Sequence, residues 1–201
     1  PFHPRSAYGI SKVTGFHLVK NYREAYKLHA SSGILFNHES PRRGFEFVTR
    51  KISHGVARIK KGLQKKLTLG NLYAVRDWGH AKDYAVSMWK ILQYKKPDNW
   101  VIATNKETTV KSFVNKVTKK LNLKIKWVGK GINEKGYLVR NKKKELVVRV
   151  DKKYYRPLEI DYLKGDPRKS FKILKYKIKY NLKDLVKDML DSDIDLSKKK
   201  L

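Results

Sequence analysis

A tyrosine and a lysine four residues apart have the spacing of an acid–base pair. Tyr8 and Lys12 share one side of a helix, because residues i and i+4 are neighbours on a helical surface. A nearby ammonium group favours the phenolate form of tyrosine, so such a pair can exchange a proton with a sugar hydroxyl while the lysine donates to a cofactor ribose. Both residue types are abundant here, and alone the pair is more often a solvated surface pair. Its place at the start of a long helix favours a catalytic role over a surface one.

A second set of polar groups lies in residues 37–44, directly after a short apolar run. The segment offers an amide in Asn37, an imidazole in His38 and guanidinium groups in Arg42 and Arg43. Open α/β sheets bind ligands at the carboxyl ends of their strands, and arginine matches phosphate with two parallel hydrogen bonds. An exposed polar loop is the alternative. The tyrosine–lysine pair one helix and one strand upstream favours a ligand-binding loop.

Two further arginines are candidates for anion contacts. Arg76 precedes an acidic residue and a tryptophan, and Arg156 lies shortly before Glu159. Arginine can clamp a diphosphate and glutamate can accept hydrogen bonds from ribose hydroxyls, although an ordinary salt bridge is the commoner role of each. No metal site is predicted, because metal-ligand spacing is missing around His17, His29 and His54.

Hydrophobic spacing predicts the helices and strands that would position these groups. Apolar residues recur every three positions over residues 8–28, which predicts a long helix with Ser6 as its N-cap. Residues 32–36 are typical of a buried strand, residues 37–44 form a polar loop, and residues 47–61 return to helical spacing. Helix, strand, loop and helix in this order are typical of an α/β sheet.

The alternation continues toward the C-terminus. We expect strands at residues 67–70, 100–104 and 145–150, helices at residues 81–93, 109–121 and 181–190, and a further helix opened by Pro167 that runs through Leu174. Residues 129–153 are otherwise irregular and rich in lysine. We interpret them as an excursion from the main body.

The charge of the chain raises the question of a polyanionic partner. The 201 residues contain 48 Lys and Arg against 18 Asp and Glu, a formal net charge of +30, which suggests a partner such as nucleic acid. Nucleic-acid-binding proteins concentrate charge on one face or tail, whereas lysine is spread over nearly every segment here. A lysine-biased solvated surface is therefore favoured, and nucleic acid is not expected as a partner. The alternative stays open on the lysine runs at residues 142–144 and 198–200, which we interpret as a loop and a frayed end.

Other classes of protein are excluded by what the sequence lacks. It has no apolar run long enough to span a membrane, no signal-peptide pattern and no cysteine. Disulfides and thiolate metal sites are therefore excluded. We expect a cytoplasmic protein without membrane association, with enough apolar residues for one core or a core with a small lobe.

Several stretches together resemble the GDP-mannose 4,6-dehydratases, a nucleotide-sugar branch of the short-chain dehydrogenase/reductases. Residues 4–26, which contain the tyrosine–lysine pair, resemble the active-site helix of that family, and residues 33–52 resemble its most diagnostic stretch. Shorter matches lie at residues 69–72, 76–79, 81–84, 155–157 and 165–167. The resemblance runs almost end to end. The loop at residues 38–44 is far more specific to this family than the tyrosine–lysine pair, which the whole superfamily shares.

The resemblance implies roles for individual residues. Tyr8 would be the catalytic tyrosine and Lys12 its partner at the cofactor ribose, and the NADP contacts would be Tyr8, Lys12, His38 and Arg43. The side chains implied to hold GDP-mannose are Asn37, Val48, Lys51, Arg76, Arg156 and Glu159.

The implied reaction is an internal redox dehydration of GDP-mannose to GDP-4-keto-6-deoxymannose. Tyr8 would remove the O4 proton as the C4 hydride passes to NADP; the ketone acidifies C5, water leaves from C6, and the hydride returns to C6. The family's glycine-rich pyrophosphate turn, and the Thr or Ser and the Glu that complete catalysis, have no counterpart in this sequence. We therefore expect the 201 residues alone not to catalyse dehydration, and we expect a segment to precede Pro1.

The expected fold class is α/β, namely the C-terminal part of a Rossmann-type sheet with helices plus a small mixed α/β substrate-binding lobe. Residues 1–128 would hold the NADP-binding part with interleaved substrate-domain segments, and residues 129–201 mainly the substrate lobe and closing helices. A homo-oligomer or a separate N-terminal half is the expected partner. Two alternative functions stay open: a non-catalytic polyanion-binding module on a degenerate fold, and a related nucleotide-sugar epimerase or reductase.

Overall fold

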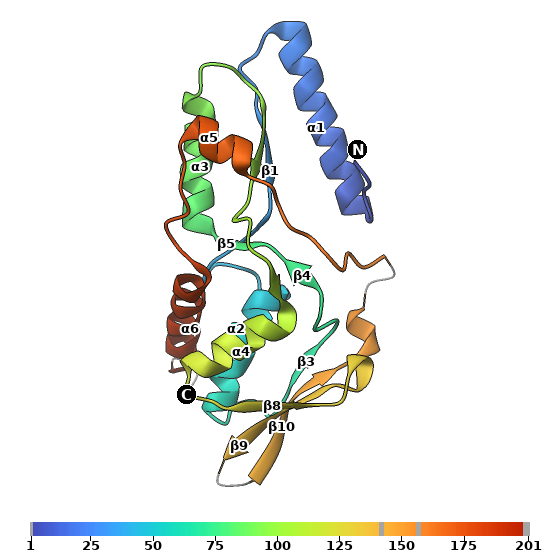
Figure 1. The fold of residues 1–201 in the computed structure, drawn as a ribbon, viewed down its shortest axis with the longest axis vertical. Coiled ribbons are helices and arrows are strands. Elements are labelled where there is room, and N and C mark those ends of the chain that lie inside the picture. The colour runs from blue at the N-terminus through green and yellow to red at the C-terminus, as the bar shows by residue number, and fades with distance from the viewer. Residues whose placement is uncertain (1, 141–142, 156–157, 199–201) are drawn as a thin grey trace.

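The structure is a computed structural model that describes residues 2–140, 143–155 and 158–198. It confirms an α/β fold in which short strands alternate with helices (Figure 1). No helix in these described ranges is both long enough and apolar enough to cross a membrane. The elements in chain order are α1 (Ala7–Tyr26), β1 (Ser32–Leu35), β2 (Asn37–Glu39), α2 (Val48–Lys60), β3 (Leu67–Leu69), β4 (Val75–Arg76), β5 (Trp78–His80), α3 (Ala81–Gln93), β6 (Asn99–Ile102), β7 (Thr108–Thr109), α4 (Val110–Lys120), β8 (Ile125–Val128), η1 (Gly131–Asn133), β9 (Lys135–Arg140), β10 (Lys143–Val150), η2 (Lys152–Tyr154), α5 (Arg168–Leu174) and α6 (Leu182–Lys198).

Helix α1 is well capped, but the rest of the described chain does not bury it. The Oγ atom of Ser6 accepts a hydrogen bond from the Gly9 N–H at 3.0 Å, as expected of an N-cap, and Lys27 ends the helix in the left-handed conformation with φ 56°. None of the helix residues is buried, and Tyr22 on the apolar face is 51% exposed. Figure 1 shows the helix beside β1 at the margin of the molecule. The apolar spacing therefore predicted the helix correctly, but the face that it marks stays half-buried or exposed.

The parallel pair of β1 and β6 forms one part of the sheet structure. Its register runs from Ser32 opposite Asn99 to Leu35 opposite Ile102. Helices α3 and α5 supply a small core together with this pair, in which the large buried rings belong to Tyr84, Trp100 and Tyr176. Segments that are far apart in the sequence therefore share this core.

The segment expected to be a polar loop, residues 37–44, begins with a strand. After Phe36 the chain stops following β6 and forms β2, which pairs in parallel with β5 from Asn37 opposite Trp78 to Glu39 opposite His80. The prediction of a loop was wrong for these three residues. A run of three polar residues carries no hydrophobic alternation, so only the partner strand reveals it. Residues 40–47 do form a turn and loop before α2.

Residues 125–150 form most of a four-stranded sheet instead of an irregular excursion. The strand order is β3-β10-β9-β8, with β10 parallel to β3 and antiparallel to β9, and β8 antiparallel to β9. Leu138, Val147 and Val148 point from this sheet into the main core. Strand β9 was missed because Gly136 interrupts its inward-facing positions. Lys143 and Lys144, expected in a loop, begin β10, while residue 142 lies outside the described residues.

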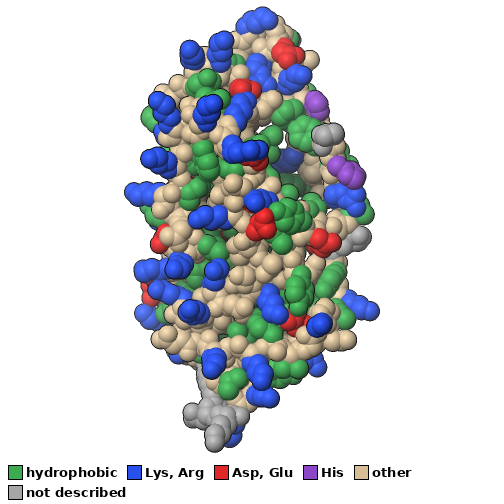
Figure 2. Space-filling model, viewed as in Figure 1, with side chains coloured by type: hydrophobic (Ala, Val, Ile, Leu, Met, Phe, Trp, Pro, Cys, Tyr) green, Lys and Arg blue, Asp and Glu red, His purple; other side chains and the backbone are tan. Residues whose placement is uncertain are grey.

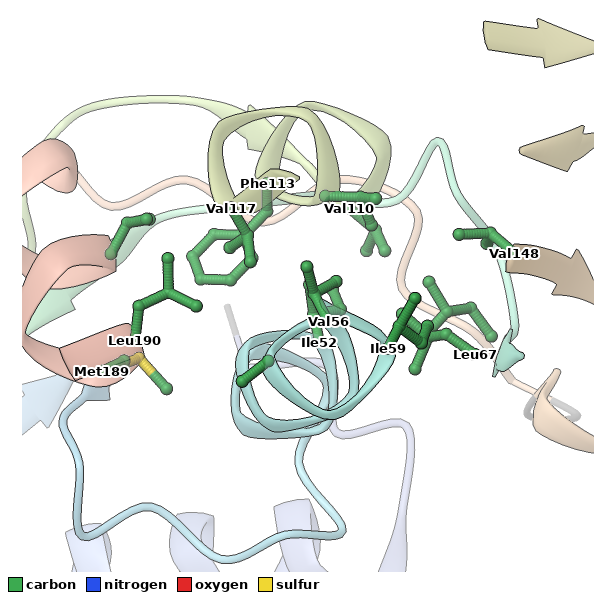
Figure 3. Packing of buried hydrophobic residues seen from close by; sticks show 14 of the residues in the cluster. Ile52, Val56, Ile59, Leu67, Val110, Phe113, Val117, Val148, Met189 and Leu190 are labelled. Atoms are coloured by element: carbon green, nitrogen blue, oxygen red, sulfur yellow. The ribbon is translucent and has the colours of Figure 1, made fainter. Parts of the chain in front are cut away.

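Helices α2, α4 and α6 pack together in the main core, and α2 also packs on β3 of this sheet. Figure 3 shows Ile52 and Val56 of α2 facing Phe113 of α4 and Leu190 of α6. Full burial of one such side chain stabilises the fold by about 1.5–3 kcal/mol. Helix α6 continues past residue 190 to Lys198, and residues 199 and 200 of the predicted frayed end lie outside the described residues.

A buried carboxylate joins α2 to α6. Asp193 is fully buried, accepts a hydrogen bond from Ser53 Oγ at 2.6 Å and forms an ion pair with Arg50 at 2.9 Å. Arg50 is itself only 3% exposed. His54 Nδ1 lies 3.4 Å from the same carboxylate. Burial lowers the pKa of His54, and the smaller effect of the Asp193 charge opposes that shift. The carboxylate therefore compensates the charge of Arg50.

Replacing Asp193 by alanine leaves the buried Arg50 guanidinium without its counter-charge, so we expect the free energy of unfolding to fall by about 3–5 kcal/mol. The matched control is Asp191→Ala on the same helix, whose pairing with Lys187 is solvent-exposed, so we expect its loss to leave the free energy of unfolding nearly unchanged. Urea denaturation followed by circular dichroism measures both variants. Equal small losses would show that the Arg50–Asp193 pair does not hold α6 to α2.

Candidate functional site

The carboxyl end of β2 is where the predicted ligand-binding loop begins. The parallel register places His38 opposite Gly79 and Glu39 opposite His80 of β5. Residues at the carboxyl ends of adjacent parallel strands meet at one edge, which is the usual ligand edge in α/β proteins. The pairing of β2 with β5 therefore places the loop at residues 40–47 at the end of β5 that leads into α3, while Arg76 precedes the opposite end of β5, on the side of Asn37.

His38 is held by its backbone and by an aromatic ring. Its Nδ1 lies 2.9 Å from the Phe36 carbonyl oxygen, and its ring stacks on Tyr84 with 5.0 Å between centroids and 27° between planes. Gly79 allows this approach, because a Cβ atom there would lie 2.5 Å from the Tyr84 ring. Burial raises the pKa of Tyr84, and the Asp77 carboxylate adds to that shift. The imidazole is thus clamped against a neutral phenol, with its Nε2 hydrogen-bonded to no other described residue.

Glu39 is the buried anchor of the arginine loop. It is 1% exposed, its Oε2 accepts a hydrogen bond from Thr49 Oγ1 at 2.5 Å, and Arg43 Nε lies 3.2 Å from the same oxygen. The Arg43 guanidinium also lies 3.6 Å above the centre of the Phe47 ring. Burial raises the pKa of Glu39, while the Thr49 hydroxyl and the Arg43 charge oppose that shift. The carboxylate therefore ties Arg43 to the start of α2.

Lys51 lies at a hollow between α2 and β3. Its Nζ is 3.6 Å from the centre of the Tyr154 ring, and its charge is the main cause that lowers the pKa of the exposed Tyr154 hydroxyl. The hollow has a volume of about 300 Å³ and combines aromatic, cationic and small side chains, namely Phe45, Lys51, His54, Gly55, Gln64, Lys66, Leu67, Thr68 and Tyr154. A planar ring with attached phosphates matches such a lining. A larger hollow of about 590 Å³ is lined by α1 residues alone, so no polar groups from different elements converge there.

Arg76 and Glu159 form an ion pair across a large sequence separation. Arg76 Nη2 lies 2.8 Å from Glu159 Oε1, and both side chains are about four-fifths buried, at 17% and 20% exposed. Strand β4 carries Arg76, and Val75 beside it exchanges backbone hydrogen bonds with the segment that follows Glu159, through Asp161 and Leu163. The two candidates that the sequence suggested separately therefore belong to one place in the structure.

Asp77 fixes the segment that follows Arg76, a role that the sequence did not reveal. This fully buried carboxylate accepts hydrogen bonds from the Thr104 N–H and hydroxyl at 2.9 and 2.6 Å and from the Asn105 N–H at 2.9 Å. The Gly165 N–H adds a longer contact at 3.4 Å. One charged group thus joins the end of β6, the start of β5 and the segment before α5.

Tyr8 and Lys12 lie on α1, apart from these groups. Lys12 Nζ is 5.1 Å from the centre of the Tyr8 ring, as the four-residue spacing predicts, and Tyr8 is 71% exposed. Within the described residues, α1 is tied to the body near its C-terminal end, where Arg23 donates a hydrogen bond to Asn99 at 3.0 Å. No hydrogen bond or ion pair among the described residues joins the pair to residues 37–44.

The structure therefore brings together some of the predicted site residues and leaves others apart. His38 and Arg43 lie on one strand-and-loop segment with Asn37, and Val48 follows at the start of α2, partly buried against the main core. Arg156 lies outside the described residues. The supporting residues that the sequence analysis missed are Glu39, Thr49, Asp77, Tyr84 and Tyr154. No group of three or more potential metal ligands occurs in the part of the chain that the structure describes.

The chain is similar over nearly its whole length to proteins of one family. The chain matches the family model for GDP-mannose 4,6 dehydratase over residues 1–189. It is 49% identical over 198 residues to the GDP-mannose 4,6 dehydratase of Dictyostelium discoideum, covering 98% of this chain and 55% of that protein. It is 48% identical over 196 residues to that of Homo sapiens, covering 98% and 52%. The chain spans about half the length of these curated relatives.

Solved structures share the fold. RMD from Pseudomonas aeruginosa complexed with NADPH superposes with a TM-score of 0.78 at 17% identity, covering 97% of this chain and 58% of that one. The dTDP-glucose 4,6-dehydratase from Bacillus anthracis in complex with NAD gives a TM-score of 0.75 at 18% identity, covering 98% and 55%. At these identities the likeness shows the fold alone, and it confirms the expected Rossmann-type α/β arrangement. Because the family model matches residues 1–189 of 201, the chain belongs to the GDP-mannose 4,6-dehydratase family.

Proposed function

We propose that this chain serves the conversion of GDP-mannose to GDP-4-keto-6-deoxymannose, with Tyr8 and Lys12 as its catalytic pair. The observation that carries the proposal is the segment of residues 37–44, in which the parallel strand β2 leads into a turn whose Arg43 is tied down by the buried Glu39. A fixed cation at that edge suits a ligand with phosphate groups. Membership of the family supports the same reaction.

The substrate side of the proposed site combines two clusters. Lys51 and Tyr154 line the hollow of about 300 Å³, whose rings and cations suit a nucleoside diphosphate. Arg76 and Glu159, held together at 2.8 Å, offer one cation and one carboxylate for the diphosphate and the sugar hydroxyls. Asn37 and Val48 would complete the contacts at the strand and helix ends, and Arg156 is assigned to the same role from the sequence alone.

The described residues fit one part of a nicotinamide dinucleotide. Tyr8, Lys12, His38 and Arg43 would hold its ribose and phosphate groups, and the clamped imidazole of His38 keeps Nε2 available for such a contact. No glycine-rich turn for the pyrophosphate occurs in the sequence. NADP, when bound, takes up a hydride from the sugar and later returns it. The preference for NADP over NAD belongs to the proposal.

Tyr8 has a defined task in the proposed reaction. Its phenolate oxygen accepts the proton from the sugar O4, and the ammonium of Lys12 favours that charged form. The proton at C5 needs a second base, which the resemblance assigns to a glutamate with no counterpart in this sequence. We therefore propose that turnover requires a second polypeptide segment that supplies this base, namely a separate N-terminal half. A homo-oligomer of this chain alone would not supply it, because every copy has the same sequence.

Binding of GDP-mannose tests the substrate site. Isothermal calorimetry of the chain with GDP-mannose, with and without NADP, should give saturable binding that Arg76→Ala weakens about 10- to 100-fold, because a charged hydrogen bond contributes roughly 1.5–3 kcal/mol. The control is Arg168→Ala, an arginine that is 84% exposed and paired with Asp166. A folded wild-type chain that does not bind GDP-mannose would contradict the proposal.

Substitution of the catalytic tyrosine tests the chemistry. We expect no turnover by the 201 residues alone, and turnover when the N-terminal half of the Dictyostelium discoideum relative is supplied as a second chain. In that mixture Tyr8→Phe should lower kcat by about 10²- to 10⁴-fold, the usual contribution of a general base, and leave GDP-mannose affinity unchanged. Tyr22→Phe, on the same helix, is the control. A Tyr8→Phe mixture as active as wild type would exclude the assigned role.

The anchoring of Arg43 predicts a distinctive pH dependence. Burial raises the pKa of Glu39 in the folded state, so ionisation of this group disfavours the folded state. The resulting loss of stability grows as pH rises from the pKa of the unfolded state through the raised pKa of the folded state. Stability of the wild type relative to Glu39→Gln should therefore fall as pH rises from about 4.5. At pH 7 the same variant should bind NADP several-fold more weakly, because Arg43 loses its anchor. Urea titrations over pH and calorimetry with NADP measure both effects. A flat stability difference would contradict the raised pKa of Glu39, and unchanged NADP affinity would contradict the anchoring of Arg43.

A further inference from the structure

The outer face of the four-stranded sheet gathers cations around a tyrosine. In the register of β8 and β9, Lys126 lies opposite Tyr137 and Val128 opposite Lys135. In the register of β9 and β10, Leu146 lies opposite Tyr137 and Arg149 opposite Lys135. Directly opposed residues share one face of a sheet. These pairs therefore form two adjacent rows across three strands.

A third row extends the same face. Lys144 lies opposite Val139, and the Val139 N–H donates to the carbonyl oxygen of Lys124 just before β8. We call the whole set the basic sheet face; it consists of Lys124, Lys126, Val128, Lys135, Tyr137, Val139, Lys144, Leu146 and Arg149. All five of its cationic side chains are exposed.

A bulge in β10 keeps the basic sheet face separate from the core. The register shifts between Leu146 and Val148, so Val147 and Val148 are both buried in the main core while Leu146 and Arg149 stay on the outer side. Arg149 reaches across to β3, where its Nε donates to Thr68 Oγ1 at 3.2 Å. Asp151, at 3.8 Å from Arg149, is the acidic side chain paired with this face.

Part of the acidic charge of the chain lies inside the molecule. Of the 18 acidic residues, five are buried inside the molecule, namely Glu39, Asp77, Asp83, Glu134 and Asp193. Figure 2 shows Lys and Arg side chains over the whole visible surface, with few acidic ones among them. Positive charge alone therefore distinguishes no face. On the basic sheet face, the half-buried side chains of Tyr137, Val139 and Leu146 share one surface with five exposed cations.

We propose that the basic sheet face binds single-stranded nucleic acid. Bases can stack on the ring of Tyr137 and contact Leu146 and Val139, while the surrounding cations neutralise phosphates. Three strands spaced about 4.8 Å apart give a surface only about 10 Å wide, which suits one extended strand. A duplex hides its bases from such a platform. An acidic peptide has charge but no rings to stack on Tyr137.

This surface borders the proposed nucleotide-sugar site at one point, because Arg149 donates a hydrogen bond to Thr68, which also lines the hollow of about 300 Å³. None of its residues belongs to the predicted NADP or GDP-mannose contacts, and Figure 1 shows the sheet at the end of the molecule away from α1 and α3. The proposal therefore stands whether or not the chain takes part in dehydration. A lysine-rich surface without a binding role would not be expected to place its lysines around Tyr137.

The test compares two variants with the same net charge. One carries Lys→Gln at the four sheet-face positions 124, 126, 135 and 144, and the control carries Lys→Gln at the exposed positions 95, 96, 172 and 177 near α3 and α5. Fluorescence anisotropy measures binding of a 12-nucleotide oligothymidylate from 50 to 200 mM salt. We expect at least tenfold weaker binding for the sheet-face variant and less than threefold for the control. The salt slope should also shrink by about 2–3, because each cation on a single strand contributes roughly 0.7.

Two further measurements make the outcome specific. Tyr137→Leu should weaken binding about 5- to 10-fold while Tyr137→Phe retains it, because the ring and not the hydroxyl stacks. Equal losses in the two quadruple variants would overturn the proposal, as would equal affinity for a duplex of the same length or equal competition by polyglutamate. Circular dichroism checks that the sheet is intact. If the quadruple variant is unfolded, the same comparison of affinities is made with single variants: Lys126→Gln and Lys135→Gln on the sheet face, and Lys95→Gln and Lys172→Gln as controls.

Discussion

The arrangement of the site depends on one buried carboxylate, Asp77. Its two oxygens receive hydrogen bonds from the backbone and hydroxyl of Thr104 and from the backbone of Asn105, with Gly165 nearby. A buried charge is tolerated only when donors surround it, and here those donors come from the end of β6 and from the segment before α5. Arg76 precedes this anchor and β5 follows it, so the position of the Arg76–Glu159 pair and the partner strand of β2 both depend on it.

The sequence predicted the elements whose signal is local. The bounds of α3 were predicted to the residue, those of α2 and α4 to within one residue, and the N-cap role of Ser6 was also found, because apolar spacing and capping chemistry act within one helix. The strands β2, β8 and β9 were missed because each is defined by its partner. Glu39 shows the reason: nothing near it in the sequence says that a parallel neighbour, Thr49 and Arg43 will enclose it.

The residues of the candidate site fall into the same two groups, those that the sequence indicates locally and those that only contacts between distant segments define. The sequence named Tyr8, His38, Arg43, Lys51 and Arg76 through their resemblance to one family, and the structure shows what holds most of them. What could not be predicted are the contacts between distant segments, such as the stacking of His38 on Tyr84 or the pairing of Arg76 with Glu159. Such contacts depend on strand pairing, which a single sequence specifies only through the whole fold.

Helix α1 differs from every other long helix in burying none of its own residues, although it carries the tyrosine–lysine pair. Residues that share little buried surface with a core open independently of it, so their amide hydrogens exchange without global unfolding. The other polar groups of the site belong to elements that unfold together with the two cores. Within the described chain, Tyr8 and Lys12 therefore belong to one cooperative unit, and the groups that would hold the nucleotide belong to another.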